Sequence, residues 1–93
     1  MSQAPTQEKI VFYSKDSCPW ARAVRHVLDQ AGLEYEERPI NLNPAFYEAL
    51  ERETGQVQQP TLKIGDDWLI DTDAKAVAKH LNLPSPATNQ RPA

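Results

Sequence analysis

Four of the eight prolines lie inside the body of the chain and limit how it can fold. They are Pro19, Pro39, Pro44 and Pro60. Proline fixes φ and has no backbone N–H, so it is tolerated in the first turn of a helix, at a sheet edge or in a turn, but not inside a helix or a central strand. Each of the four therefore marks a boundary between short elements within residues 8–83, which we interpret as one domain.

The other four prolines lie in two polar segments at the ends of the chain, residues 1–7 and 84–93. Both segments are rich in Ser, Thr, Gln, Asn, Ala and Pro, and they contain too few large apolar residues to be packed into a core. We expect both to be disordered tails.

Between the boundaries, the apolar residues follow strand-like and helix-like patterns in turn. Residues 10–13 are a continuous β-branched and aromatic run, typical of a strand buried on both faces. A helix begins at Cys18 and ends at Gly32, and a second begins at Asn43 and ends at Gly55. The pattern further predicts strands over 35–40, 61–64 and 68–70, an acidic turn over 65–67, and a last helix capped by Thr72 or Asp73.

The order β-α-β-α-β-β-α predicts an α/β domain with a mixed four-stranded sheet. A chain of 93 residues is long enough for one such domain but not for two. The net charge of −3 gives no reason to expect nucleic-acid binding, and no apolar run is long enough to cross a membrane. With one cysteine, neither an internal disulfide nor a multi-cysteine metal site can form within the chain. An unpaired thiol and a polar start without a secretory signal indicate a cytoplasmic protein.

The one cysteine stands where a helix is expected to begin. Cys18 follows the loop after the first strand and immediately precedes Pro19. At this place the unpaired backbone N–H groups and the positive end of the helix dipole stabilise a thiolate more than a thiol. Lys15, in the same loop, adds a positive charge. A lone cysteine is more often a small buried apolar residue, but this position favours a nucleophile.

The segment around the cysteine resembles the active site of glutaredoxins. Residues 13–21, Tyr-Ser-Lys-Asp-Ser-Cys-Pro-Trp-Ala, are similar to the family's motif in which a lysine precedes Cys-Pro-aromatic-Cys or Cys-Pro-aromatic-Ser. The resemblance continues through residues 35–37, the helix end at 54–56, Pro60 before the third strand and an acidic residue that begins the last helix. It implies a thioredoxin-like fold, with helices flanking the four-stranded sheet.

The resemblance implies a glutathione-dependent thiol–disulfide oxidoreductase with Cys18 as its catalytic nucleophile. Ala21 stands where dithiol relatives have a second, resolving cysteine. One thiol is enough to remove glutathione from mixed disulfides, because a second glutathione regenerates the cysteine. We therefore expect a monothiol enzyme that acts on glutathionylated proteins or small-molecule disulfides, with glutathione as cosubstrate, and we expect it to be a monomer.

The resemblance also implies a glutathione-binding site around the thiol. The family's cis-proline corresponds to Pro60, and the backbone of the residue before it pairs with the cysteinyl part of glutathione. Two side chains match positions that hold the glycyl carboxylate, an aromatic residue covers the tripeptide, and the start of the last helix receives the γ-glutamyl group. In this sequence the implied glutathione-binding residues are Lys15, Trp20, Gln56, Gln59, Pro60, Thr72 and Asp73.

Two departures from the family pattern affect this site. Gln58 and Gln59 stand where the family usually has Thr-Val, which makes the surface before the proline more polar. Ile70 and Asp71 replace a Gly-Gly pair, so side chains and a negative charge occupy a place that glycines keep open. These departures leave open a thioredoxin-fold protein that binds partners without catalysis.

A second alternative is a dimeric carrier of a [2Fe–2S] cluster, in which Cys18 of each chain and two glutathione molecules ligate the cluster. The cluster-binding subgroup known best has Cys-Gly-Phe-Ser, which is absent here, and the Pro19-Trp20 pair crowds the bridging position. No other metal site is expected. His26 lies about 12 Å along the helix from Cys18, too far for a catalytic pair, and we expect both His26 and His80 to be surface residues. We interpret the acidic run of Glu34, Glu36 and Glu37 as the solvated face of an edge strand.

Overall fold

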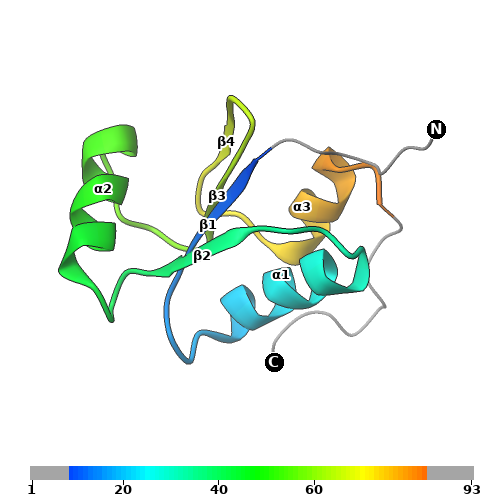
Figure 1. The fold of residues 1–93 in the computed structure, drawn as a ribbon, viewed down its shortest axis with the longest axis horizontal. Coiled ribbons are helices and arrows are strands. Elements are labelled where there is room, and N and C mark those ends of the chain that lie inside the picture. The colour runs from blue at the N-terminus through cyan, green and yellow to red at the C-terminus, as the bar shows by residue number, and fades with distance from the viewer. Residues whose placement is uncertain (1–8, 84–93) are drawn as a thin grey trace.

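The computed structural model describes residues 9–83. The two tails predicted to be disordered lie outside the described residues, together with Glu8. Seven elements follow in the predicted order β-α-β-α-β-β-α (Figure 1). They are β1 (Ile10–Ser14), α1 (Pro19–Gln30), β2 (Glu36–Pro39), α2 (Pro44–Thr54), β3 (Thr61–Ile64), β4 (Asp67–Leu69) and α3 (Ala74–His80). No helix within this range is long and apolar enough to cross a membrane.

The four strands form one mixed sheet in the order β2-β1-β3-β4. β1 is parallel to β2 and antiparallel to β3, and β3 is antiparallel to β4, so the sheet is mixed, as predicted. β2 is an edge strand, which explains why it accommodates Pro39 and several charges. The hairpin turn is shorter than predicted, since Asp67 already pairs with Ile64, and Ile70 therefore follows the strand instead of ending it.

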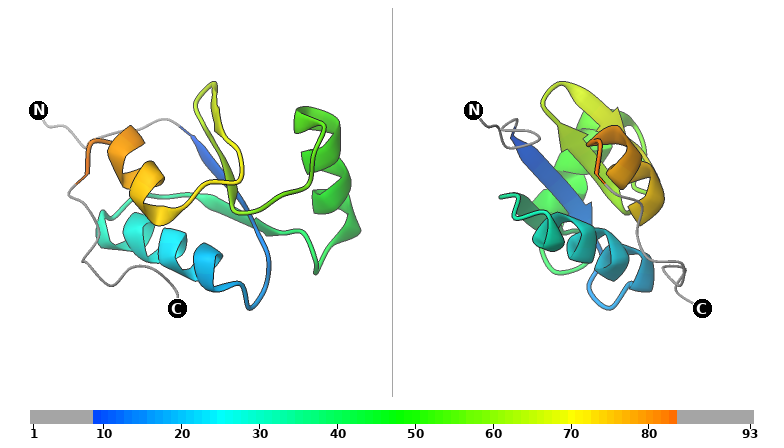
Figure 2. Two further views of the ribbon diagram at one scale, coloured as in Figure 1. Left: turned by 180° about the vertical axis from the view of Figure 1, so that it is seen from behind. Right: turned by 90° about the vertical axis from the view of Figure 1, so that its right-hand side faces the viewer.

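Helices cover both faces of the sheet, and successive side chains of β1 point alternately to the two faces. α1 and α3 lie side by side on one face, whereas α2 lies on the other and near one end of the sheet (Figures 1 and 2). We call these the α1/α3 face and the α2 face. The buried core of the α1/α3 face comprises Ile10, Phe12, Ala21, Val24, Val27, Leu28, Leu62, Ile64, Ala74, Val77, Ala78 and Leu81. That of the α2 face comprises Val11, Tyr13, Ile40 and Leu50.

Local signals in the sequence account for the helix ends. The Asn43 side chain accepts a hydrogen bond from the Ala45 N–H at 2.9 Å and caps α2, with Pro44 in the first turn. Gly55 ends α2 with φ 75°, a left-handed conformation that favours glycine. Of the two predicted caps of α3, the structure selects Asp73, whose carboxylate accepts from the Ala76 N–H at 2.9 Å.

Candidate active site

Cys18 is the N-cap residue of α1, as predicted. Its backbone is extended, its N–H donates to the Lys15 carbonyl at 3.1 Å and its carbonyl accepts the first helical hydrogen bond from Arg22 at 3.0 Å. The thiol makes no capping hydrogen bond, so it is available for chemistry. The side chain is half-buried and packs against the core of the α1/α3 face. The thiol therefore lies at the positive end of a twelve-residue helix, where a thiolate is stabilised.

The loop that carries Cys18 is tied to the neighbouring loop between β2 and α2. Ile40 donates its N–H to the Ser14 carbonyl at 2.8 Å, and the Asp16 N–H donates to Asn41 Oδ1 at 2.8 Å. Ser17, directly before the cysteine, has φ 72°. Residues other than glycine rarely adopt this left-handed backbone conformation, so the loop is held in a specific shape immediately before Cys18.

Pro60 lies at the same end of the sheet as the Cys18 loop. Tyr13 of β1 pairs with Thr61 of β3, so the residue before Thr61 is placed beside the end of β1 from which the loop departs. The peptide bond between Gln59 and Pro60 is cis, as the family resemblance implies. Pro60 is buried, and its carbonyl accepts the Thr72 N–H at 2.8 Å. The structure thus brings the loop before β3 and the start of the α3 region together beside the cysteine loop.

Ile70 and Asp71 occupy the turn after β4. Asp71 has φ 53°, so it adopts the left-handed conformation that glycine would adopt without cost, and Asp is among the residues that tolerate it best. The Asp71 N–H donates to Thr61 Oγ1 at 3.1 Å, which keeps this turn on β3. Ile70 is 46% exposed and Asp71 is exposed. The backbone of this turn is therefore held in place, while its rim carries an apolar side chain and a carboxylate.

The remaining predicted residues differ in how free their side chains are. Lys15 is exposed and forms no ion pair within residues 9–83, and Trp20 is 42% exposed in the first turn of α1. The amide of Gln56 is bound locally, since its Nε2 donates to Thr54 Oγ1 and its Oε1 accepts from the Gln58 N–H. Gln56 therefore orders the segment that leads to Pro60, and its contact with glutathione stays a prediction.

A polar network that was not predicted from the sequence lies directly behind the cysteine loop. Ser14, the last residue of β1, is buried and donates its hydroxyl to Glu37 Oε2 at 2.8 Å. Arg25 of α1 donates through Nε and Nη2 to the two oxygens of the same carboxylate, at 2.9 and 2.6 Å. The Arg25 guanidinium lowers the pKa of Glu37 from its ordinary value, and the Ser14 hydroxyl acts in the same direction against the effect of burial. The network joins β1, β2 and α1 next to the residues that lead to Cys18.

The three acidic residues of the 34–37 region were interpreted as a solvated face, and this is wrong for Glu37. Glu34 and Glu36 are exposed, but Glu37 is half-buried. Side chains alternate along a strand, so Glu37 points to the α1/α3 face, where Arg25 meets it. Both histidines are exposed, as predicted, and His80 Nε2 lies 3.4 Å from Asp67 Oδ2.

The sheet order, the helix placement and a cysteine at the N-terminus of α1 on the same sheet end as a cis-proline define a thioredoxin-like protein. The comparison with families narrows the class, because the glutaredoxin family model matches residues 10–69. The chain belongs to the glutaredoxin family. No curated protein matches its sequence significantly.

Solved structures of glutaredoxins share the fold. A buckwheat glutaredoxin in complex with glutathione is 25% identical with a TM-score of 0.63, over 84% of this chain and 74% of that one. The Archaeoglobus fulgidus glutaredoxin is 15% identical with a TM-score of 0.66, over 78% of this chain and 85% of that one. The glutaredoxin-like NrdH-redoxin of Escherichia coli, described with a thioredoxin-like activity profile, is 23% identical with a TM-score of 0.64, over 84% and 99%. These relationships support a thiol oxidoreductase role.

Proposed function

We propose that this protein is a glutathione-dependent oxidoreductase that removes glutathione from mixed disulfides, with Cys18 as its single catalytic thiol. The observation that carries the proposal is the placement of Cys18. It caps α1 with its thiol unused, at the sheet end that also holds cis-Pro60, and Ala21 stands one turn further along the helix. A second thiol is therefore absent where dithiol enzymes resolve the intermediate.

The reaction proceeds in two exchanges. The Cys18 thiolate attacks the glutathione sulfur of a mixed disulfide, a new S–S bond forms, and the substrate leaves as a thiolate that takes a proton from water. The thiolate of a second glutathione then attacks the glutathione sulfur bound to Cys18. That step releases glutathione disulfide and restores the Cys18 thiolate. Each cycle therefore consumes one free glutathione, and the disulfide bond passes from the mixed disulfide to glutathione disulfide while the substrate is released as a thiol.

Glutathione would bind across the surface formed by the cysteine loop, the cis-proline and the turn before α3. The Gln59 backbone, which is joined to Pro60 by the cis peptide bond, would pair with its cysteinyl part, and Trp20 would cover it. The unpaired Lys15 ammonium suits the glycyl carboxylate. Since the Thr72 N–H is bound to Pro60, the γ-glutamyl carboxylate would use the N–H groups that follow at Asp73 and beyond.

A second candidate function is favoured by Ile70 and Asp71. The exposed Ile70 side chain presents an apolar surface in the turn after β4, and the Asp71 carboxylate repels an incoming carboxylate. Together they suit a protein that binds an apolar partner at this end of the fold without turnover of glutathione. The two functions differ in one respect that can be measured, because only the enzyme needs the Cys18 sulfur.

The experiment compares steady-state reduction of a glutathione mixed disulfide by the wild-type protein, Cys18→Ser and Lys79→Gln. We expect Cys18→Ser to fall to the uncatalysed rate, because a hydroxyl cannot form the mixed disulfide. Lys79 is exposed on α3, so the matched Lys79→Gln control retains wild-type activity. Equal, negligible turnover in all three proteins would refute the enzyme and favour the partner-binding function. If the wild-type protein is active, replacement of Ile70 and Asp71 by glycine should raise its affinity for glutathione. An unchanged affinity would show that these two side chains do not hinder glutathione binding.

A further inference from the structure

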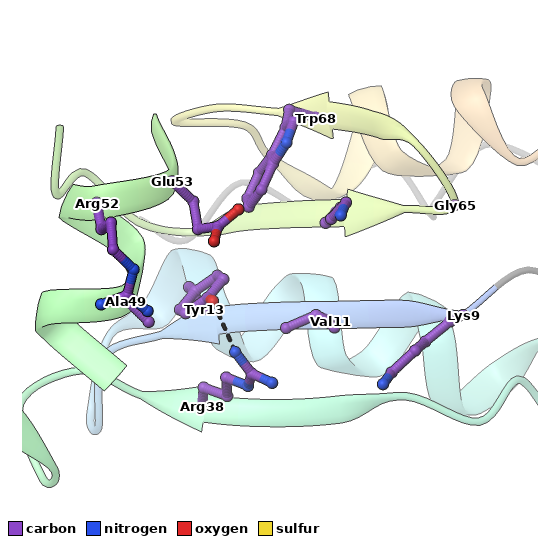
Figure 3. Close-up of a pocket in the computed structure, with 10 residues that line it drawn as sticks. Lys9, Val11, Tyr13, Arg38, Ala49, Arg52, Glu53, Gly65 and Trp68 are labelled. Atoms are coloured by element: carbon purple, nitrogen blue, oxygen red, sulfur yellow. Dashed lines mark hydrogen bonds between the residues drawn. The ribbon is translucent and has the colours of Figure 1, made fainter. Parts of the chain in front are cut away.

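The α2 face carries a pocket that lies outside the proposed glutathione site. It has a volume of about 250 Å³ and lies between α2, the sheet and the hairpin of β3 and β4 (Figure 3). None of the predicted glutathione-binding residues lines it. Its floor is formed by β1, with Val11 and Tyr13, and its sides by the other strands and by α2. The pocket exists because α2 covers only one end of this face, whereas α1 and α3 together cover the opposite face.

Positive charge dominates the lining. Four cationic side chains and one carboxylate, that of Glu53, contribute to it, although the chain as a whole has a net charge of −3. The four cations are Lys9, Arg38, Arg52 and Lys63. Arg38 is neutralised by Glu36, whose carboxylate accepts from its Nε at 2.8 Å. The other three form no ion pair within residues 9–83, so the pocket retains an excess of about two positive charges.

Two of the four cations, Arg38 and Lys63, lie against aromatic rings. Tyr13 and Trp68 stack with their centroids 6.3 Å apart and an angle of 21° between the rings. Lys63 Nζ lies 5.7 Å from the Trp68 ring centroid, and Arg38 Cζ lies 5.4 Å from that of Tyr13. Arg38 also donates from Nη1 to the Tyr13 hydroxyl at 2.7 Å, as Figure 3 shows. Arg38 and Lys63 are thus positioned by contacts that leave further N–H donors of each unused.

The three unpaired cations come from three different parts of the fold. Lys9 precedes β1, Arg52 lies in the last turn of α2, and Lys63 lies in β3. A ligand with a single carboxylate would neutralise only one of these positive charges. To neutralise them all, a ligand must carry two or three negative charges and several acceptor oxygens within a small volume. A diphosphate group meets both requirements, since its oxygens accept charge-assisted hydrogen bonds from lysine and arginine.

From this geometry we propose that the pocket binds the diphosphate group of a small molecule, at a site separate from the catalytic cysteine. Lys9 and Arg52 lie at opposite ends of the pocket in Figure 3, so they reach one diphosphate only if their long side chains turn inward when it binds, and the Trp68 ring forms the adjacent wall. A nucleoside diphosphate and free pyrophosphate share this chemistry. They differ in the group that would contact Trp68, so the two sources can be separated by experiment.

The test is a fluorescence titration of the full chain carrying Trp20→Phe, in which Trp68 is the only remaining tryptophan. Pyrophosphate, ADP and citrate are added separately at about 0.15 M ionic strength, where weak surface attraction is screened. We expect a saturable change of Trp68 emission with pyrophosphate and with ADP. Tighter binding of ADP would assign the site to nucleotides, and equal binding would assign it to free diphosphate. No saturable change with either, or citrate binding as tightly as pyrophosphate, would overturn the proposal.

Charge-removing variants locate the site. Arg52→Gln and Lys63→Gln, each in the Trp20→Phe background, should weaken pyrophosphate binding about tenfold, the loss expected for one charge-assisted hydrogen bond. Arg52 is exposed on α2, so its replacement leaves the fold intact even if Lys63→Gln does not. Lys75→Gln is the matched control, because Lys75 is exposed on α3 and does not line the pocket. An equal loss in Lys75→Gln, or no loss in Arg52→Gln, would show that the anion does not bind in this pocket.

Discussion

The two faces of the sheet differ in how much apolar surface they bury. Twelve buried residues form the core of the α1/α3 face, and four form that of the α2 face. The first face holds Cys18 against a continuous core, whereas the second carries charged side chains of β2 and β3 under a helix that covers only one end. One well-packed face is therefore enough to hold the cysteine loop, and the other face can carry polar and charged side chains.

Alternation along the strands explains how one sheet supports both faces. In β1, Ile10 and Phe12 point to the α1/α3 face, and Val11 and Tyr13 point to the α2 face. All four are buried, so β1 contributes to both cores. In β3, however, Leu62 and Ile64 are fully buried on the first face, while Lys63 lies on the second and faces Trp68. The asymmetry between the two faces therefore arises in β3 and not in β1, although both are central strands.

The largest expected effect compares the two cores directly. Leu28→Ala removes a fully buried side chain from the twelve-residue core and should lower the free energy of unfolding by about 3–5 kcal/mol. Leu50→Ala removes an equally buried side chain from the smaller core, where the surroundings can collapse, and should cost about 2–3 kcal/mol. Denaturant unfolding of both variants measures the difference. If Leu50→Ala lowers the free energy of unfolding as much as Leu28→Ala or more, the two cores do not differ in how tightly they are packed.

The next effect concerns the network of Glu37. Glu37→Gln should lower the free energy of unfolding by about 1–2 kcal/mol at neutral pH, because the half-buried Arg25 loses its charged partner. Glu34→Gln is the control, since Glu34 is exposed and forms no ion pair within the described residues. Urea unfolding of the three proteins gives the values, and equal losses in both variants would refute a special role for Glu37.

The same pair has a defined pH dependence. Arg25 lowers the pKa of the folded Glu37 below the ordinary value of 4.5, so the folded state binds a proton less readily than the unfolded state. Its contribution to stability is complete above about pH 4.5 and is lost as the pH falls through the folded pKa. The stability difference between the wild type and Glu37→Gln should therefore shrink on acidification, and a constant difference would contradict this account.

A smaller effect is expected at the helix caps on the two faces. Asn43→Ala and Asp73→Ala each remove a side chain that accepts a backbone N–H, at the start of α2 and of α3 respectively. Each should lower the free energy of unfolding by about 1 kcal/mol, the usual cost of a lost N-cap. If the looser α2 face tolerates fraying, thermal unfolding should show a smaller loss for Asn43→Ala than for Asp73→Ala. The opposite order would show that α2 is as firmly coupled to the fold as α3.

The smallest effect at neutral pH belongs to Tyr35, which packs against Phe12 with ring centroids 6.1 Å apart. Burial and the hydrogen bond that its hydroxyl donates to Asp29 raise the pKa of Tyr35 to about 12. The unfolded tyrosine ionises near pH 10, so stability should be unchanged below that pH and should fall between about pH 10 and 12. Ultraviolet titration of the tyrosinate in the folded wild type, with Tyr35→Phe as the reference, measures the midpoint. A midpoint near pH 10 would show that burial and the hydrogen bond to Asp29 do not raise the pKa of Tyr35.

Much of the fold follows from short-range signals. The signals that begin and end the helices act within one turn, so their effects can be deduced from neighbouring residues. Examples are Pro44 after Asn43, Gly55 in the left-handed conformation and Cys18 before Pro19. The strands were predicted within a residue or two for the same reason, and the shorter hairpin turn was missed because either Asp67 or Trp68 can begin a strand there. The cis bond before Pro60 followed from the family resemblance and not from the residues themselves.

Long-range polar partners were not predictable in this way. Glu37 meets Arg25 twelve positions earlier and Ser14 twenty-three positions earlier, and nothing in the local pattern distinguishes it from the exposed Glu36. The cations of the pocket that form no ion pair within the described residues also come from separate segments, at positions 9, 52 and 63. In the sequence they are ordinary surface charges, and they gather only where α2 leaves the sheet uncovered.

The order of the elements and the place of Cys18 at a helix N-terminus could be deduced from the sequence, because caps, prolines and apolar periodicity act over a few residues. Tertiary packing sets which end of the sheet holds both Cys18 and Pro60, which face buries Glu37 and where the cationic pocket forms. These properties depend on strand register and on the placement of α2, and both arise from packing between segments that are distant along the chain.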